Sequence, residues 1–303
     1  MTRQLALALL LMSASLALGF AVRRAFLERE ATEPAALAQP TAAQPAPSTL
    51  TVSHLEGRVE LRDPDGGGWM PLAADAKVSE RDSVRTDHDA RAVLVAGDGL
   101  QVEVSAQSQV ELTDIQGDQA KLLVERGRLS ARVGGDARTL QVGVQGTDAI
   151  VQTQHASFSV LRDEHAQVAV AVTDGDVAVT AQRSQVKVLA GQQSVVAVDR
   201  PPAAPIRIPT SLFLKVARSG PSHINQRSTE VGGETTPGAV VLVNGVPAKT
   251  DLQGRFSAKI ELKEGKNALQ ITARDVLGRS EQQLLPAVVV DTEPPKLQGK
   301  TVW

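Results

Sequence analysis

Residues 127–133 read Gly-Arg-Leu-Ser-Ala-Arg-Val, a stretch in which apolar and polar residues alternate. Successive side chains of a β-strand point to opposite faces, so this pattern predicts a strand with one buried and one solvated face. The same alternation recurs in residues 57–61, 100–104 and 185–189. No stretch longer than about eight residues holds a helical period in this part of the chain. We therefore predict an all-β module over residues 51–198.

Short turn dipeptides separate the predicted strands. Asp65-Gly66, Asp98-Gly99 and Asp174-Gly175 are of the kind that tight hairpins require. Strands joined by such turns pair antiparallel, so we expect an antiparallel β roll or sandwich. The whole chain has five Phe, two Trp and no Tyr, so valine is expected to fill most of the core.

A second module is predicted after a proline-rich linker. Four prolines occur in the nine residues from Pro201 to Pro209, which marks a linker at residues 199–210. Beyond it, an apolar run ends in Asn244-Gly245, a strong hairpin signal. We predict a small antiparallel β-sandwich over residues 211–293, followed by a tail at 294–303.

The N-terminus carries an export signal within residues 1–26. Residues 5–22 are apolar and uncharged, and as a helix they would measure about 27 Å, enough to cross a thin bilayer core. Two alternatives stay open: a signal peptide cut after Ala17-Leu18-Gly19, or an uncleaved hydrophobic helix that anchors the chain in the inner membrane, which the flanking Arg23-Arg24 favours. Both predict that the remainder lies outside the cytoplasm, in the periplasm or cell envelope when anchored and secreted when cleaved.

An Ala- and Pro-rich linker is predicted at residues 27–50, as a spacer or a simple tether. The charge that follows it disfavours nucleic acid as a partner, because residues 51–200 hold 15 basic and 22 acidic groups and would repel a phosphate backbone. The absence of cysteine from the chain excludes disulfides and thiolate metal sites.

Several short motifs, in order, resemble the FecR domain of bacterial envelope proteins over roughly residues 51–198. They are Trp69-Met70-Pro71-Leu72, Asp82-Ser83-Val84-Arg85-Thr86, Ala92-Val93-Leu94, Gly127 with Leu129, and the later Val177 and Ala190-Gly191 segments. The chain departs from the pattern near Asp75, where a glycine usually follows the Trp-x-Pro-Leu segment, and at Arg81, where a glycine often precedes the aspartate.

The resemblance implies a periplasmic module of the kind found in transmembrane regulators that bind a sigma factor through a cytoplasmic segment. Only Met1 to Gln4 precede the apolar run. We therefore expect no cytoplasmic sigma-regulating domain, and a module that serves signalling or cell-wall architecture.

The second module is similar to the bacterial immunoglobulin-like (glucodextranase B-like) domain found in surface proteins and beside some glucan-acting enzymes. The resemblance rests on turn residues: Val243-Asn244-Gly245, Asp251, Gly254-Arg255-Phe256, Glu264-Gly265-Lys266-Asn267 and Ala273-Arg274-Asp275.

No catalytic, cofactor or metal residue is predicted, and we expect no enzyme. Ser184–Lys187 matches a Ser-x-x-Lys spacing that needs a helix, yet it lies in an alternating strand. Asp87–Asp89, or His155 with His165, carry metal-binding side chains, and Asp63–Gly66 is similar to the start of a calcium loop. We interpret the loops at 87–89 and 63–66 as solvated turns.

The function expected from the sequence is a non-catalytic envelope protein that acts in binding, as a scaffold or as a sensor. Its partner is expected to be an envelope protein or a cell-wall glycan, docked on exposed strand edges. The alternative is a carbohydrate- or peptidoglycan-binding adhesive protein, which requires exposed aromatic side chains. Trp69 is then a stacking platform rather than a core residue, and Trp303 a second candidate. A glycan hydrolase, which needs a cleft with paired carboxylates, ranks last.

Overall fold

The computed structural model describes residues 49–97, 99–135, 138–218 and 222–293. The apolar run at 5–22, the linker before Thr49 and the tail with Trp303 lie outside this part of the chain. The described residues contain strands and no helix, which confirms the all-β prediction for them. Among them there is accordingly no helix long and apolar enough to cross a membrane.

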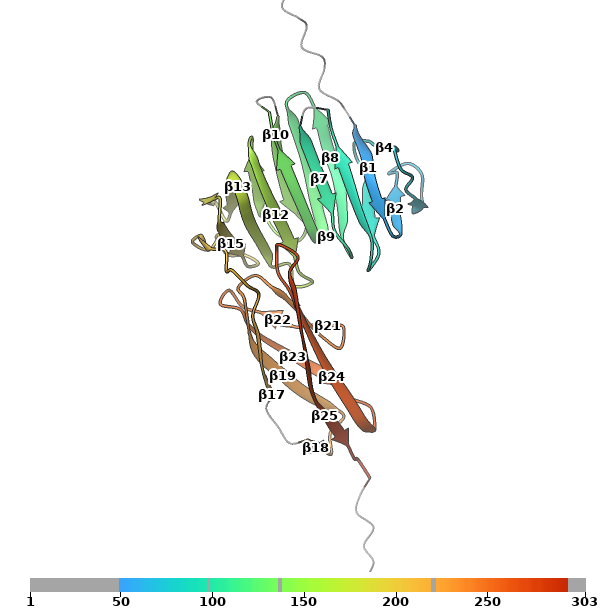
Figure 1. Cartoon of the computed structure of the whole chain (residues 1–303), viewed down its shortest axis with the longest axis vertical. Coiled ribbons are helices and arrows are strands. Elements are labelled where there is room, and N and C mark those ends of the chain that lie inside the picture. The colour runs from blue at the N-terminus through green and yellow to red at the C-terminus, as the bar shows by residue number, and fades with distance from the viewer. Residues whose placement is uncertain (1–48, 98, 136–137, 219–221, 294–303) are drawn as a thin grey trace, which may run out of the picture. The chain divides into compact units, whose positions relative to one another are not determined.

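The first module consists of strands β1 to β16, joined through hydrogen bonds that link all sixteen (Figure 1). Their bounds are β1 Leu50–Glu56, β2 Val59–Arg62, β3 Met70–Pro71, β4 Lys77–Val78, β5 Ser83–Thr86, β6 Arg91–Val95, β7 Leu100–Val104, β8 Gln109–Gln116, β9 Gln119–Val133, β10 Thr139–Val144, β11 Ile150–Thr153, β12 Ala156–Arg162, β13 Val168–Ala181, β14 Ser184–Leu189, β15 Gln192–Val196 and β16 Ile206–Arg207.

Two long strands pass between the two sheets of this module. The first half of β9 pairs with β8 and β10 in one sheet, and its second half pairs with β7 and β12 in the other. β13 passes the opposite way. Each strand bends at a glycine with a left-handed backbone, Gly127 (φ 80°) and Gly175 (φ 70°). A Cβ at Gly175 would lie 2.3 Å from the carbonyl oxygen of His155, so only glycine fits the bend.

The expectation of purely antiparallel pairing is wrong at β10, which runs parallel to β9. The reason is the bend in β9. After the second half of β9 has crossed to the other sheet, the chain returns to the first sheet in the original direction. Thr139 then pairs with Gln119 and Val144 with Val124.

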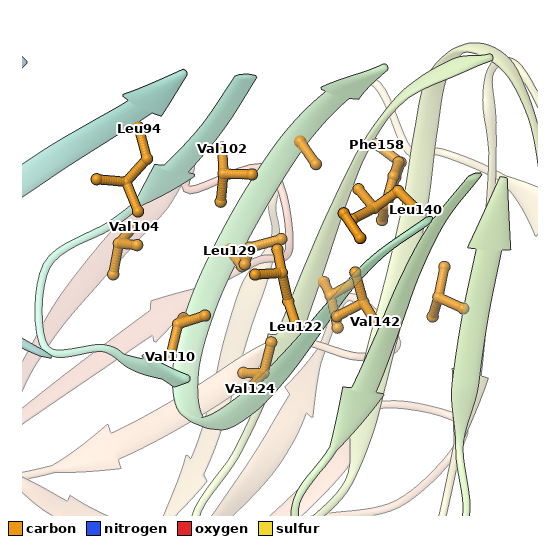
Figure 2. Close-up of a cluster of buried hydrophobic side chains, with 14 of the residues drawn as sticks. Leu94, Val102, Val104, Val110, Leu122, Val124, Leu129, Leu140, Val142 and Phe158 are labelled. Atoms are coloured by element: carbon orange, nitrogen blue, oxygen red, sulfur yellow. The ribbon is translucent and has the colours of Figure 1, made fainter. Parts of the chain in front are cut away.

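The core of the first module lies between its two sheets and consists mainly of valine and leucine. Figure 2 shows Val102, Leu122, Leu129 and Leu140 turned toward one another, with Phe158 beside them. All five side chains are buried. The alternation in the sequence therefore marks the inward residues, and burial of these side chains supplies the main driving force for folding.

Two residues that depart from the family pattern have the left-handed backbone conformation that glycine favours. Asp75 and Arg81 both adopt left-handed backbone angles, with φ of 61° and 69°. Glycine reaches this region without steric cost, whereas other residues enter it against a penalty. The turns before β4 and β5 thus adopt left-handed backbone angles at residues that are not glycine.

The second module is a two-sheet sandwich. One sheet has the order β17-β19-β23-β22 and the other β18-β25-β24-β20-β21, with β18 parallel to β25 and the remaining pairs antiparallel. The bounds are β17 Leu214–Arg218, β18 His223–Ile224, β19 Ser228–Thr235, β20 Val240–Val243, β21 Val246–Pro247, β22 Lys249–Thr250, β23 Arg255–Glu261, β24 Gly265–Arg274 and β25 Ser280–Val290.

The two modules meet within one compact unit that spans residues 46–303. The segment predicted as a linker contributes β16, which pairs with β15 of the first module. Buried Gln193 donates a hydrogen bond from Nε2 to the carbonyl oxygen of Pro237, 3.0 Å away. We call the apolar contact between the modules the junction cluster: Leu161, Ala169, Ala171, Val195 and Val276 are buried there, and Ile208, Val240, Leu252 and Leu277 pack against them.

Candidate functional site

Two motifs weighed for chemistry lie in ordinary structural settings. Ser184 and Lys187 both lie on β14, and the Lys187 ammonium pairs with Asp176 at 3.2 Å. A strand does not bring residues i and i+3 to the same face, so the Ser-x-x-Lys spacing forms no catalytic pair. The loop at 63–66 is a turn in which the Asp63 carboxylate accepts the N–H of Asp65 at 2.8 Å.

The histidines and their neighbours do not gather into a metal site. The Asp87 carboxylate accepts the N–H of His88 at 2.7 Å in the turn between β5 and β6, and the His88 ring faces the same carboxylate. This hydrogen bonding holds the pKa of Asp87 below its usual value. His155 and His165 lie in separate exposed turns. Within the described residues, no three His, Asp or Glu side chains come together as ligands.

Trp69 is neither a core residue nor a free stacking platform. Its ring is half-buried, with the guanidinium of Arg85 4.1 Å and that of Arg62 4.9 Å from the ring centroid. The Arg85 guanidinium forms an ion pair with the Glu60 carboxylate, with 2.5 Å between Nη2 and Oε2. The hydrogen bond from Arg85, and to a smaller extent that from Arg58, lowers the pKa of Glu60. The interpretation of Trp69 as a core residue is therefore wrong, because the ring is only half-buried and cations of β2 and β5 lie over it.

The other described aromatic residues leave little surface for sugar stacking. Phe158 and Phe256 are buried in the two cores. Phe213, 46% exposed before β17, is the most accessible aromatic side chain of the described residues.

A cleft of about 550 Å³ lies where the two modules meet, and we call it the junction cleft. One wall comes from the first module, through the turns after β5 and β7, the bend of β9 and the end of β12. The opposite wall comes from β20, β21, β24 and the start of β25. Clefts of this size between domains are common ligand sites.

Four arginines line the junction cleft: Arg126, Arg128, Arg162 and Arg274. Burial lowers the pKa of the Arg128 guanidinium, which is 18% exposed; the Glu103 carboxylate raises this pKa, and the neighbouring Arg274 lowers it. The nearest carboxylate oxygen of Glu103 is 3.8 Å from Arg128, too far for a hydrogen bond. The cleft is thus cationic although its first wall belongs to an acidic module.

A five-residue turn at 275–279 fixes the wall of the second module. The Asp275 carboxylate accepts the N–H groups of Leu277 and Arg279 at 3.1 and 2.8 Å, and the Arg279 guanidinium closes back onto it. Gly278, in this turn, lies against the guanidinium of Arg128. Sequence reasoning found the turn but missed the cleft. The one sequence feature that could have drawn attention to this wall of the cleft is the pattern Asp-x-x-Gly-Arg, which occurs at both 251–255 and 275–279.

The described chain is therefore a two-module β-protein with a cleft at the junction of the modules. Comparison with known families identifies part of the first module: residues 82–178 match the model described as FecR protein, and the chain contains a FecR domain there. All residues of the first wall of the cleft lie within this range. No curated protein matches the chain.

Solved structures show a partial likeness. Two crystal structures of a candidate anti-sigma factor from Parabacteroides distasonis are 20% and 21% identical to the chain, each with a TM-score of 0.36. Each alignment covers 41% of this chain and 59% of that protein. A polysaccharide lyase aligns over 81% of this chain and 40% of its own length, with 8% identity and a TM-score of 0.21.

Proposed function

We propose that this protein is a non-catalytic binding protein of the bacterial cell envelope, which presents a surface shared by its two modules to another envelope protein. The observation that carries the proposal is the junction cleft: its first wall is largely built by the FecR domain, and the second module completes it. A partner that enters the cleft contacts both modules at once and can sense their arrangement.

The proposal includes an immunoglobulin-like identity for the second module. The sheet orders β17-β19-β23-β22 and β18-β25-β24-β20-β21 support it. Lettered A to G in chain order, with β18 as A′ and β21 as C′, these sheets read A-B-E-D and A′-G-F-C-C′, the order of immunoglobulin sandwiches. Such modules commonly serve as rigid spacers and binding surfaces.

We further propose that residues 5–22 direct the chain out of the cytoplasm and, when uncleaved, anchor it in the inner membrane. Support comes from the uncharged apolar run and the arginines at 23 and 24. Fractionation of cells that express the chain, with the N-terminus of the mature protein sequenced, tests both points. A chain found in the cytoplasm contradicts the proposal.

A protein partner is favoured over a glycan by the state of the aromatic side chains. Sugar-binding surfaces use a free aromatic face, whereas the Trp69 ring is covered by Arg62 and Arg85. The junction cleft contains no aromatic side chain in its lining. The glycan alternative therefore becomes an outcome of the experiment below.

Site-specific photocrosslinking in cells that export the full-length chain tests the proposal. A photoreactive benzoylphenylalanine replaces Gln107, an exposed residue of the cleft lining, and in a control strain it replaces Gln185, exposed on β14 outside the cleft. We expect a discrete protein adduct from position 107 and none from position 185.

Adducts absent from both positions, or identical at both, contradict a protein partner at the junction. The full-length chain is also sedimented with insoluble peptidoglycan at low and high salt. Salt-resistant retention without any adduct from position 107 identifies the glycan alternative as the correct one.

A further inference from the structure

We propose that the junction cleft binds an acidic peptide segment of the partner, whose carboxylates pair with Arg126 and Arg274 beside Arg128. This inference rests on the proposed function and names the chemistry of the partner. It depends on three observations at the cleft: unpaired cations, an unpartnered buried hydroxyl, and apolar walls.

The cations of the cleft exceed the carboxylates available to neutralise them. Neither Arg126 nor Arg274 forms an ion pair or hydrogen bond through its side chain with any described residue, although both line the cleft. The Asp163 carboxylate of the lining is already occupied, because it accepts the N–H groups of His165 and Gln167 at 2.9 and 2.7 Å.

The remaining charged groups of the lining do not alter this balance. Asp87 is engaged with His88, and Arg162 donates to the carbonyl oxygens of Gln145 and Asp163. Glu164 is exposed at the cleft and is the one acid of the lining without a recorded partner in the described chain. Arginine presents a planar set of donors that matches a carboxylate, so an incoming acid has two free partners here.

Ser105 provides an independent sign of a missing ligand. The residue lines the cleft and is 93% buried, and its Oγ has no hydrogen-bond partner among the described residues. The backbone N–H of Ser105 donates to the carbonyl oxygen of Arg128, so Ser105 lies beside strand β9. A buried hydroxyl without a partner is costly. A rotation of the side chain toward the cleft would let a ligand acceptor satisfy it.

The apolar part of the lining indicates a peptide as the source of the carboxylate. Leu161 faces the cleft from the first module, and Val240, Leu242 and Pro247 from the second. A sugar acid would meet no aromatic side chain for stacking there. A peptide in which acidic residues alternate with aliphatic ones matches both the arginines and these side chains.

Fluorescence anisotropy with the full-length chain in mild detergent tests the inference. The probe is the fluorescein-labelled peptide Leu-Glu-Val-Glu-Leu, and the matched probe is Leu-Gln-Val-Gln-Leu. We expect salt-dependent binding of the glutamate peptide and none of the glutamine peptide. The double substitution Arg126→Gln with Arg274→Gln is expected to weaken binding at least about tenfold, the scale of a lost charged hydrogen bond.

The control is Arg132→Gln, which removes one arginine charge from strand β9, as Arg126→Gln does, at an exposed position outside the cleft lining. It is expected to leave affinity unchanged. Equal losses in the control and the double variant, or no loss in the double variant, overturn the inference. Stronger displacement of the probe by soluble peptidoglycan fragments than by unlabelled peptide overturns the choice of a peptide.

Ser105→Ala separates a binding role from a structural one. Because the Oγ is unpartnered, its removal should leave the melting temperature unchanged or slightly higher, while peptide affinity falls severalfold. A lower melting temperature with full affinity contradicts the assigned role. If the peptide fails to bind while the adduct from position 107 persists, the acidic-peptide inference is contradicted and the proposed function stands. If neither peptide binding nor the adduct is observed, both the inference and the proposed function are contradicted.

Discussion

The turns at 251–255 and 275–279 have the same sequence pattern and the same internal geometry. In each, the first aspartate accepts the N–H groups two and four residues later, and the arginine at the fifth position donates back to its carboxylate. The fourth residue is glycine with φ of 84° or 85°. The local sequence pattern therefore gives the same turn geometry at both places in the chain.

The two turns differ in what they pack against. The Asp251 side chain is 41% exposed, whereas that of Asp275 is 3% exposed. Val276 is buried in the junction cluster, and the Arg279 guanidinium also donates to the carbonyl oxygen of Pro209 at 2.8 Å. Leu252 of the first turn also packs against the junction cluster, so both turns reach the junction. The comparison teaches that one local motif can have an exposed or a buried aspartate, depending on its tertiary contacts.

A third turn, at 163–167, has the same aspartate geometry without the arginine. The Asp163 carboxylate again accepts the N–H groups two and four residues on, but the fifth residue is Gln167. Burial raises the pKa of Asp163. At Asp251 burial also raises the pKa, yet the backbone and side chain of Arg255 and the N–H of Gln253 outweigh it and lower the value. The two aspartates thus differ in burial, with side chains 8% and 41% exposed, as well as in the presence of the arginine.

The largest expected difference between the two turns follows removal of the aspartate. Asp275→Ala deletes two backbone hydrogen bonds and the partner of Arg279 in a buried setting, so we expect a loss of about 3 kcal/mol in the free energy of unfolding. Asp251→Ala is expected to lose about 1 kcal/mol or less, because water replaces the lost partner. Urea titration of the full-length chain measures both. Equal losses would show that the junction does not distinguish the turns.

A smaller difference is expected from the arginines. Lysine cannot donate in the planar arrangement with which Arg279 reaches both Asp275 and Pro209. Arg279→Lys should cost about 1 to 2 kcal/mol, and Arg255→Lys less than about 0.5 kcal/mol. Thermal unfolding of the two variants side by side provides the measurement. The reverse order would refute the connector role of Arg279.

The smallest effect is a contrast in pH dependence. The pKa of Asp251 is lowered on folding, so its contribution is present above the unfolded value of about 3.9 and is lost as pH falls through the folded value. The pKa of Asp163 is raised, so its contribution is present below about 3.9 and is lost as pH rises through the folded value.

Melting temperatures of the wild type, Asp251→Asn and Asp163→Asn between about pH 3 and pH 7 test this contrast. Relative to its asparagine variant, the wild type should lose stability with acid at position 251 and gain it at position 163. Asparagine keeps an acceptor for the backbone N–H groups. The same sign at both positions would contradict the opposite pKa shifts of the two aspartates.

Much of the fold could be predicted from the sequence because its signals are local. The alternation at 127–133 marks the inward residues of β9, and Asn244-Gly245 marks the tight turn between β20 and β21. The parallel pairing of β10 could not be predicted in this way. It arises from the bend of β9 at Gly127, whose effect depends on the second sheet.

The site was less predictable, because it joins distant parts of the chain. The sequence alone predicts Trp69 as either exposed or buried, because the cations of Arg62 and Arg85 reach the ring only through the pairing of β2 with β5. Arg126 and Arg274 lie in different modules and share a cleft only after the modules meet. The net negative charge of the first module would not predict a cationic cleft in its wall.

The central claim is that the 275–279 turn holds the modules together, so that the cleft keeps both walls. Hydrogen exchange of the full-length chain, resolved to single amides by mass spectrometry, tests it most directly. The amides of Leu277 and Arg279 should exchange at least about tenfold more slowly than those of Gln253 and Arg255, although all four donate to a turn aspartate. Equal, fast exchange in both turns would show that the junction opens in solution and would contradict the account.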